Sequence, residues 1–243
     1  MSFAVTHLIG FGGKRAAAVG GNDSYTELLL HCDGTDASTT FTDSSSNARS
    51  VTAVGNAQID TSDSKFGGAA GLFDGTGDYL QLSNHADWDI TGDFTIDMWV
   101  KTDTLSGTMG LIGHGGYSSG SGGWDLRLVN QTLGFNCYET TGLVRDGIAT
   151  GNVITSTSAW YHVAAVRNGS SVVIYVDGVA AVTDASFATI LANTNTLEVA
   201  AIRHSSNGGN PAFGFDGWID ELRLSKGIAR WTSAFTPPSA AYS

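Results

Sequence analysis

Residues 160–182, WYHVAAVRNGSSVVIYVDGVAAV, constrain the fold of this chain more than any other stretch. Two dipeptides in it, Asn168-Gly169 and Asp177-Gly178, favour tight hairpins because both residues of such a pair tolerate positive φ. The β-branched and apolar runs around them are typical of strands. We therefore predict an antiparallel meander of three strands, Trp160–Arg167, Val172–Val176 and Val179–Val182.

Short strand signals recur along the rest of the chain. In DFTIDMWVKT, the apolar residues Phe94, Ile96, Met98 and Val100 alternate with their neighbours and would share one face of a strand. No amphipathic helix of about ten or more residues is indicated. The 32 glycines and only three prolines suit tight turns between strands. Strands without helices predict an all-β sandwich or barrel.

Composition limits the classes of protein that need consideration. At 42% hydrophobic residues, the 243-residue chain can build a core within one domain. Its net charge of -11 repels phosphate backbones, so we expect no nucleic-acid partner. No apolar run approaches the ~18 residues of a membrane span, so we expect no membrane insertion.

The two cysteines, Cys32 and Cys137, allow a disulfide or two buried thiols. We favour the thiols, because a core of this size needs no covalent staple.

Residues 1–24 read as an N-terminal arm, and residues 25–243 as the domain. The arm contains FAVTHLIGF at residues 3–11, which is too apolar to suit water. It is either a disordered tail or an anchoring peptide. It has no basic n-region and its apolar stretch is interrupted by Thr6 and His7, which argues against a secretory signal.

Several motifs occur in a familiar order: LLLHCDGTD, FGGAAGLFDGTGDYLQL, FTIDMWVKT, WYHVAAVRNGSSVVIYVDGV and GFDGWIDELRLSKGIARW. Together they resemble the laminin G-like jelly roll of the concanavalin A-like lectin/glucanase superfamily, over about residues 25–238. The resemblance implies a two-sheet antiparallel jelly-roll sandwich, with one sheet concave, preceded by the extended arm.

The HCDGTD start and the FTPP ending resemble versions of this domain in tailed-bacteriophage virion proteins. This implies a non-enzymatic protein of the phage particle, either a capsid decoration protein or a tail-tip or fibre adhesin. We expect it to be a homo-oligomer that binds other virion proteins through the arm and host-surface glycans through the domain. The alternatives are a structural cement module without a ligand, and an extracellular carbohydrate-binding domain on a bacterial surface.

The resemblance also implies a structural Ca²⁺ between the exit of the first strand and the last strand. The matching positions are Asp33 in HCDGTD and Asp220 in WIDELR, with Asp36, Asp43 and Asn47 as further candidate ligands. Ca²⁺ takes six to eight oxygen ligands, which such a loop can supply. The alternative is that these side chains only form Asx turns.

A second acidic stretch, DGTGD, lies at residues 74–78. Its glycines, Gly75 and Gly77, can supply positive φ, so the stretch fits a tight hairpin. We expect Asp74 and Asp78 to bond local amides there and not to hold a metal.

Glycan binding needs exposed aromatic rings and polar groups. Two Gly- and Ser-rich segments, GHGGYSSGSGGWD and RHSSNGGNPAFGFD, predict surface loops that could carry them. The candidate ligand-binding residues are His114, Tyr117, Trp124 and Asp125 from the first, and Arg203, His204, Asn207 and Asn210 from the second. We expect Trp124 to stack on sugar, and Trp99, Trp160 and Trp218 to lie in the core because they fall within strand patterns.

Catalytic patterns are missing from the sequence. The glucanase relatives carry two glutamates flanking an aspartate on one strand, whereas WIDELR offers only Glu221. Neither a GxSxG nor an HExxH motif occurs. We therefore expect a binding protein and not an enzyme, since a shared fold does not confer activity.

Overall fold

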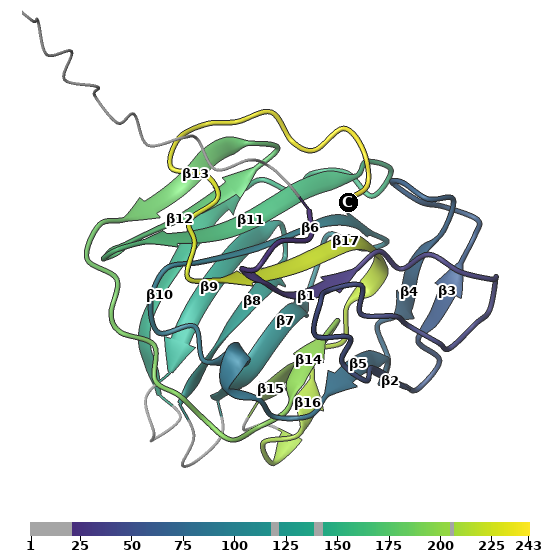
Figure 1. The fold of residues 1–243 in the computed structure, drawn as a ribbon, viewed down its shortest axis with the longest axis horizontal. Coiled ribbons are helices and arrows are strands. Elements are labelled where there is room, and N and C mark those ends of the chain that lie inside the picture. Colours follow the sequence, from purple (N-terminus) through teal and green to yellow (C-terminus); the bar gives the residue numbers. More distant parts are fainter. Residues whose placement is uncertain (1–20, 118–121, 139–142, 205–206) are drawn as a thin grey trace, which may run out of the picture.

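The computed structural model describes residues 21–117, 122–138, 143–204 and 207–243 (Figure 1). Most of the expected arm, residues 1–20, lies outside the described residues. Helix makes up 2% of the structure and includes the single turn η1 (Ala86–Trp88). In the described part, no helix is long and apolar enough to span a bilayer. The all-β class is confirmed.

The first sheet holds eight strands of the described chain. They are β1 (Thr26–Leu30), β3 (Gln58–Asp60), β4 (Ala70–Asp74), β6 (Phe94–Thr102), β11 (Tyr161–Asn168), β12 (Ser171–Val176), β13 (Val179–Asp184) and β17 (Asp216–Lys226). Their order is β13-β12-β11-β6-β17-β4-β3, with β1 paired to β17.

The second sheet holds nine strands of the same described ranges. They are β2 (Thr52–Val54), β5 (Tyr79–Leu82), β7 (Thr108–Tyr117), β8 (Gly123–Val129), β9 (Thr132–Tyr138), β10 (Val144–Asn152), β14 (Leu197–Val199), β15 (Ile202–His204) and β16 (Pro211–Ala212). The main order is β10-β9-β8-β7-β14-β5-β2, and β15 pairs with β16 and with the end of β7.

The predicted meander is present as β11, β12 and β13, paired antiparallel in sequence order. Gly169 takes φ 63° in the first turn, and Asp177 and Gly178 take 49° and 77° in the second. Three of the four dipeptide residues thus adopt the left-handed backbone, whereas Asn168 ends β11 opposite Ser171, so the first turn is Gly169-Ser170.

The core lies between the two sheets, as expected of a jelly-roll sandwich. Phe94, Ile96, Met98 and Val100 of β6 all point into it. The two cysteines are free buried thiols, as favoured from the sequence. Burial raises the pKa of the Cys137 thiol to about 11.

The DGTGD stretch forms a turn, but the expected hairpin is wrong. It joins β4 to β5, and these strands pair with different sheets, so the turn carries the chain from one sheet to the other. Its local chemistry is as predicted: Gly75 and Gly77 have φ 77° and 80°. Asp74 Oδ1 accepts the Thr76 N–H at 2.8 Å, and Asp78 Oδ2 accepts the Asp74 N–H at 3.1 Å.

The C-terminal tail, residues 228–243, covers the outer face of the first sheet. Trp231 and Phe235 pack there against Tyr175 of β12. The start of the described chain joins it, because Asn22 N donates to Ser243 O at 3.1 Å and Asp23 pairs with Arg230 at 2.8 Å. The two ends of the described domain therefore meet on this face.

Candidate functional site

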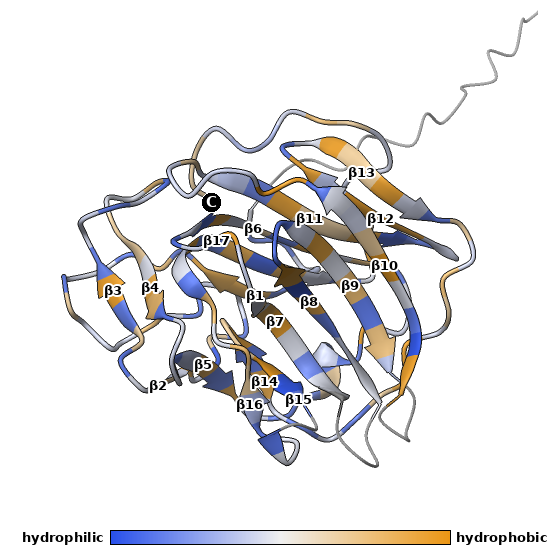
Figure 2. Ribbon diagram, turned by 180° about the vertical axis from the view of Figure 1, so that it is seen from behind, coloured by the Kyte–Doolittle hydropathy of each residue, from blue (hydrophilic) through white to orange (hydrophobic). Residues whose placement is uncertain are grey.

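The outer face of the second sheet carries a polar layer on β8 and β9. Along β8, Trp124, Leu126 and Leu128 point into the core, so Asp125 and Arg127 point outward because successive strand side chains alternate. The same rule places Gly134, Asn136 and Tyr138 of β9 outward, opposite Leu133, Phe135 and Cys137 in the core. Figure 2 shows this alternation of hydropathy along β9.

A hollow of about 390 Å³ lies over this layer, and we call it the sheet hollow. Its lining includes Arg127, Val129, Asn130, Gly134, Asn136 and Ala149. The lining thus combines small and apolar groups with side chains that form hydrogen bonds, and placed polar groups of this kind fix the orientation of a ligand in small-molecule sites.

The polar side chains of the sheet hollow are fixed from beneath. Arg127 Nη2 donates to the Tyr138 hydroxyl at 2.7 Å, and that hydroxyl donates to Asp125. Asn136 Nδ2 and Arg127 Nε each lie 3.2 Å from Asp125 Oδ1. Burial raises the pKa of Asp125, although the charge of Arg127 opposes this. Arg127 and Asn136 are thus preorganised at the surface of the layer.

The two candidate loop segments meet beside this layer. Arg203 and His204 of β15 pair in parallel with Gly116 and Tyr117 at the end of β7. Burial and the nearby charge of Arg127 lower the pKa of His204. The structure thus brings His204 together with Arg127 and Asp125.

Arg203 and Asn207 are engaged within the protein. Arg203 Nη2 lies 2.9 Å from Glu198 Oε1 and donates to Thr196 Oγ1 at 2.5 Å. Burial raises the pKa of Glu198. Asn207 is exposed, and its Nδ2 donates to Pro211 O at 2.7 Å.

The expectation that Trp124 is an exposed stacking ring is wrong. Trp124 is 0% exposed and stacks on Phe135 in the core, with its Nε1 donating to Trp88 O at 2.8 Å. His114 is buried too, and its Nε2 lies 2.9 Å from Asn195 O. Both residues occupy inward positions of their strands and are therefore unavailable to a surface ligand.

The other tryptophans differ from one another. Trp99 is buried, as expected, on the outer side of β6 under Lys65. Trp160 and Trp218 are only half-buried, and their indole N–H groups donate to Asp63 and Asp60, at 2.9 and 2.6 Å. The expectation that these two belong to the core is wrong.

The region proposed for calcium centres on Asp220. Its Oδ2 accepts the N–H groups of Lys65 and Phe66 at 2.8 and 2.9 Å. Its Oδ1 is buried and has no hydrogen-bond partner among the described residues. Burial raises the Asp220 pKa to about 7, with Glu221 and Asp33 contributing.

Asp33 lies beside this region, and its carboxylate occupies space that only a glycine at position 67 leaves free. A Cβ added to Gly67 would overlap the Asp33 carboxylate. Gly67 also has φ 64°, which disfavours any other residue. A buried, unpartnered carboxylate oxygen beside a second acid and a loop rich in carbonyls fits the oxygen ligands of Ca²⁺.

The further candidate calcium ligands form hydrogen bonds with other groups of the protein. Asp43 Oδ1 accepts the Leu29 and Ser45 N–H groups, and Oδ2 accepts the Arg49 N–H. Asp36 Oδ1 accepts the Thr61 N–H at 3.1 Å. Asn47 donates to Glu27 at 2.9 Å. Both Asp43 oxygens thus already accept hydrogen bonds from the backbone. Within the described ranges, no group of three or more His, Cys, Asp or Glu side chains could by itself hold a metal ion.

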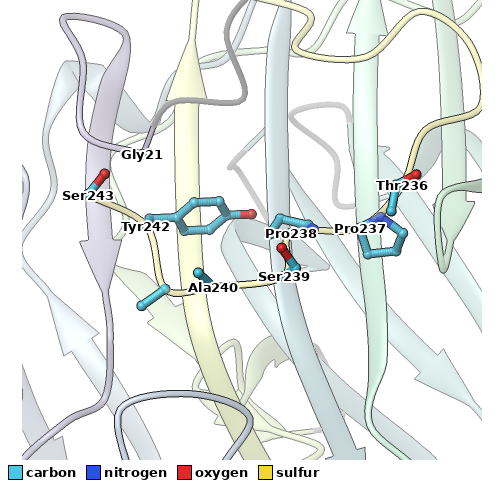
Figure 3. A pocket seen from close by; sticks show the side chains of 9 residues that line it. Gly21, Thr236, Pro237, Pro238, Ser239, Ala240, Tyr242 and Ser243 are labelled. Carbon is cyan, nitrogen blue, oxygen red and sulfur yellow. The ribbon is translucent and has the colours of Figure 1, made fainter.

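A hollow of about 400 Å³, the tail hollow, lies between Gly21 and residues 236–243 (Figure 3). Its lining is mostly Pro, Ala and Ser, and the described residues give it no layer of polar side chains like that beneath the sheet hollow. Size alone therefore does not make it the better candidate for a binding site.

Comparison with known families shows the superfamily of the chain. The model for the concanavalin A-like lectin/glucanases superfamily, Laminin_G_3, matches residues 74–230. The chain belongs to this superfamily. No curated protein matches the chain at a significant level.

Solved structures share the fold at low identity. The binding domain of Paraclostridial Mosquitocidal Protein 1 has a TM-score of 0.61 at 16% identity, covering 85% of this chain and 50% of that one. The Botulinum Neurotoxin type G receptor-binding domain has a TM-score of 0.59 at 13% identity, with 85% and 49% covered. The binding domain of Botulinum Neurotoxin DC, solved with SialylT, has a TM-score of 0.59 at 15% identity, with the same coverage. This member of the superfamily thus spans about half of those structures.

Proposed function

We propose that this chain is a lectin-like binding domain whose sheet hollow takes an oligosaccharide. The observation that carries the proposal is the fixed pair Arg127 and Asn136, held by Asp125 and Tyr138 at the surface of the sheet hollow. Sugar hydroxyls need hydrogen-bonding groups whose positions are already set, since binding then orders fewer side chains. Superfamily membership supports the proposal, as do neighbours that are named receptor-binding domains.

Blocking the sheet hollow tests this function. A Cβ added at Gly134 would come no closer than 3.6 Å to its neighbours, and Gly134 lines the hollow, so Gly134→Val is expected to narrow it. Gly92→Val is the matched control, because a Cβ at Gly92 meets nothing within 4 Å and Gly92 does not line the hollow.

The assay is a printed array of neutral and sialylated glycans. Native protein and the Gly92→Val control should be retained, and Gly134→Val should lose about tenfold or more in affinity, the value of one or two hydrogen bonds. If no glycan on the array binds the native protein, or if Gly134→Val binds with the same affinity as the native protein, the proposal is wrong.

We also propose a role without catalysis, which the surroundings of Glu221 support. Its Oε1 lies 2.8 Å from His31 Nδ1, and its Oε2 accepts the Tyr242 N–H at 2.8 Å. Glu221 is 1% exposed. Both oxygens are thus committed in a buried position, whereas a glycosidase needs two carboxyl groups facing its substrate.

For the biological setting, we retain the proposal of a phage virion protein carried by its N-terminal arm and assembled as a homo-oligomer. The geometry supports such an anchor. The arm joins the domain at Gly21, whose carbonyl lies 3.5 Å from Arg223 Nη1 on the outer side of the first sheet. The sheet hollow lies on the outer side of the second sheet, so an arm bound to a particle would leave that hollow facing away from it. A deletion of residues 1–20 that still incorporates into particles would contradict the anchor.

We also propose a structural Ca²⁺ held by Asp220 and Asp33, supported by the buried, unpartnered Oδ1 of Asp220. Such an ion would neutralise two neighbouring carboxylates and tie β17 to the loop after β1.

A further inference from the structure

A further hollow, of about 320 Å³, lies between the loop preceding β2 and the segment that follows β5, and we call it the rim hollow. Its polar lining residues are Asn47, Arg49, Ser50, Ser83, Asn84 and His85. None of them lines the sheet hollow. Its volume falls at the lower end of small-molecule sites, which begin at about 300 Å³.

Two charged or ionisable side chains of the rim hollow are held by groups outside it. The guanidinium carbon of Arg49 lies 4.8 Å from the centre of the Trp88 ring, and the group pairs with Asp87. His85 Nδ1 lies 2.9 Å from Asp87 Oδ2. Asp87 therefore fixes both side chains and offsets the charge of Arg49.

The two amides of the rim hollow are fixed in the same way. Asn47 Nδ2 donates to Glu27 Oε2 at 2.9 Å. Asn84 Oδ1 lies 3.1 Å from Nε2 of the buried His114. Exposed side chains normally move among rotamers, so anchoring each from behind is a feature of preorganised sites.

Several hydrogen-bonding groups remain unused within the described part of the chain. Arg49 Nε is buried without a partner, and a buried donor of this kind requires one. The free end of each anchored side chain, Asn47 Oδ1, Asn84 Nδ2 and His85 Nε2, also makes no hydrogen bond there.

The unused groups include both donors and acceptors, and the charge of Arg49 is already offset. Hydroxyl groups donate and accept at once, so a polyhydroxylated ligand suits this set better than an anion does.

We propose that the rim hollow is a second binding site, which takes one neutral sugar ring. The ligand class rests on the proposed lectin-like function, whereas the site itself rests on the anchored side chains. Two sites on one domain would allow one chain to engage two branches of a glycan or two glycans, which raises avidity without new contacts.

The experiment is an NMR titration of the ¹⁵N-labelled full chain with methyl β-galactoside and with N-acetylglucosamine. We expect saturable shifts of the Asn47 and Asn84 side-chain amides. In the double variant Asn47→Ala/His85→Ala, the affinity measured at the Asn84 amide should fall about tenfold, the equivalent of the hydrogen bonds removed. Both positions are exposed, so the fold should tolerate the changes. Ser46→Ala, exposed and outside the lining, is the control.

The Gly134→Val variant separates the two proposals. If Gly134→Val still shows the amide shifts at the rim hollow but no longer binds the array glycans, both proposed sites are supported. If the rim amides respond to neither sugar, or if the double variant responds as the native chain does, the rim site is wrong, whatever the array shows. If the rim responds and no array glycan depends on Gly134, the proposed function of the sheet hollow fails and the rim site stands.

Discussion

The guanidinium carbon of Arg223 lies 3.8 Å from the centre of the Tyr242 ring, and both side chains contact Asp97. Three separate elements, β17, the C-terminal tail and β6, therefore share one buried polar contact. Burial alone would raise the pKa of Asp97, but the charge of Arg223, the neighbouring His162 and the hydrogen bond from Tyr242 outweigh it and lower the pKa to about 2. The tail is thus fastened to the first sheet by charge as well as by packing.

Tyr242→Phe should lower the free energy of unfolding by about 1–3 kcal/mol, because the ring stays over Arg223 while buried Asp97 loses a donor. Urea unfolding measures this. Tyr25→Phe is the control: Tyr25 is 44% exposed, and its change should stay within about 0.5 kcal/mol. Equal effects of the two variants would show that the tail contact adds nothing.

Stability should fall in mild acid because of His114. Burial lowers its folded-state pKa to about 4, below the unfolded value of about 6.5. The unfolded chain then binds the proton first, so stability is lost as pH falls from about 6.5 to 4. The difference in free energy of unfolding between native protein and His114→Gln, measured over pH 4–8, should become smaller as the pH falls through that range. A constant difference would contradict this.

Much of the fold could be predicted from local signals. The turn dipeptides at 168–169 and 177–178 predicted the meander, because the left-handed φ that Gly169, Asp177 and Gly178 adopt is a local property of the chain. The alternation in β6 predicted its core face. The DGTGD turn shows the limit: its backbone was predictable, but the pairing of β4 and β5 with different sheets depends on distant strands.

The site was predicted less well, for a physical reason. Glycine and serine around Trp124 suggested a loop, yet the alternation in WDLRLV and TLGFNCY places Trp124 inward and Arg127 and Asn136 outward. That period-two signal was available in the sequence and would have found both residues. The anchoring of Asn84 by His114, in contrast, joins residues 30 positions apart and has no local signal.

Trp124→Phe should reduce stability and leave binding intact. The substitution removes core volume and leaves the buried Trp88 carbonyl without its donor, so we expect a loss of about 1–3 kcal/mol in the free energy of unfolding. Urea unfolding and glycan binding of the folded variant are measured together. Lost glycan binding without lost stability would restore Trp124 as a contact residue.

Asp220 should give the opposite dependence on pH from His114. Its folded-state pKa of about 7 exceeds the unfolded value of about 3.9, so in the metal-free protein the folded state binds more protons between these values. Stability from this group is present at low pH and is lost as pH rises from about 4 to 7. Asp220→Asn should remove that decline and unfold at higher urea than native protein at pH 8. A native decline that survives in the variant would contradict this.

Bound Ca²⁺ should offset the loss of stability that the ionised Asp220 carboxylate causes. An ion bound only by the folded state stabilises it in proportion to the logarithm of its concentration, about 2.7 kcal/mol at 100 times the dissociation constant. Added CaCl₂ at pH 8 should therefore raise the Tm of native protein, and EGTA should abolish the rise. Asp220→Asn should show little response, whereas Asp36→Asn should respond as native protein does, because Asp36 bonds the Thr61 amide. An unchanged native Tm with EGTA and with CaCl₂ would exclude the ion and leave Asp220 as a buried acid held by the amides of Lys65 and Phe66 alone.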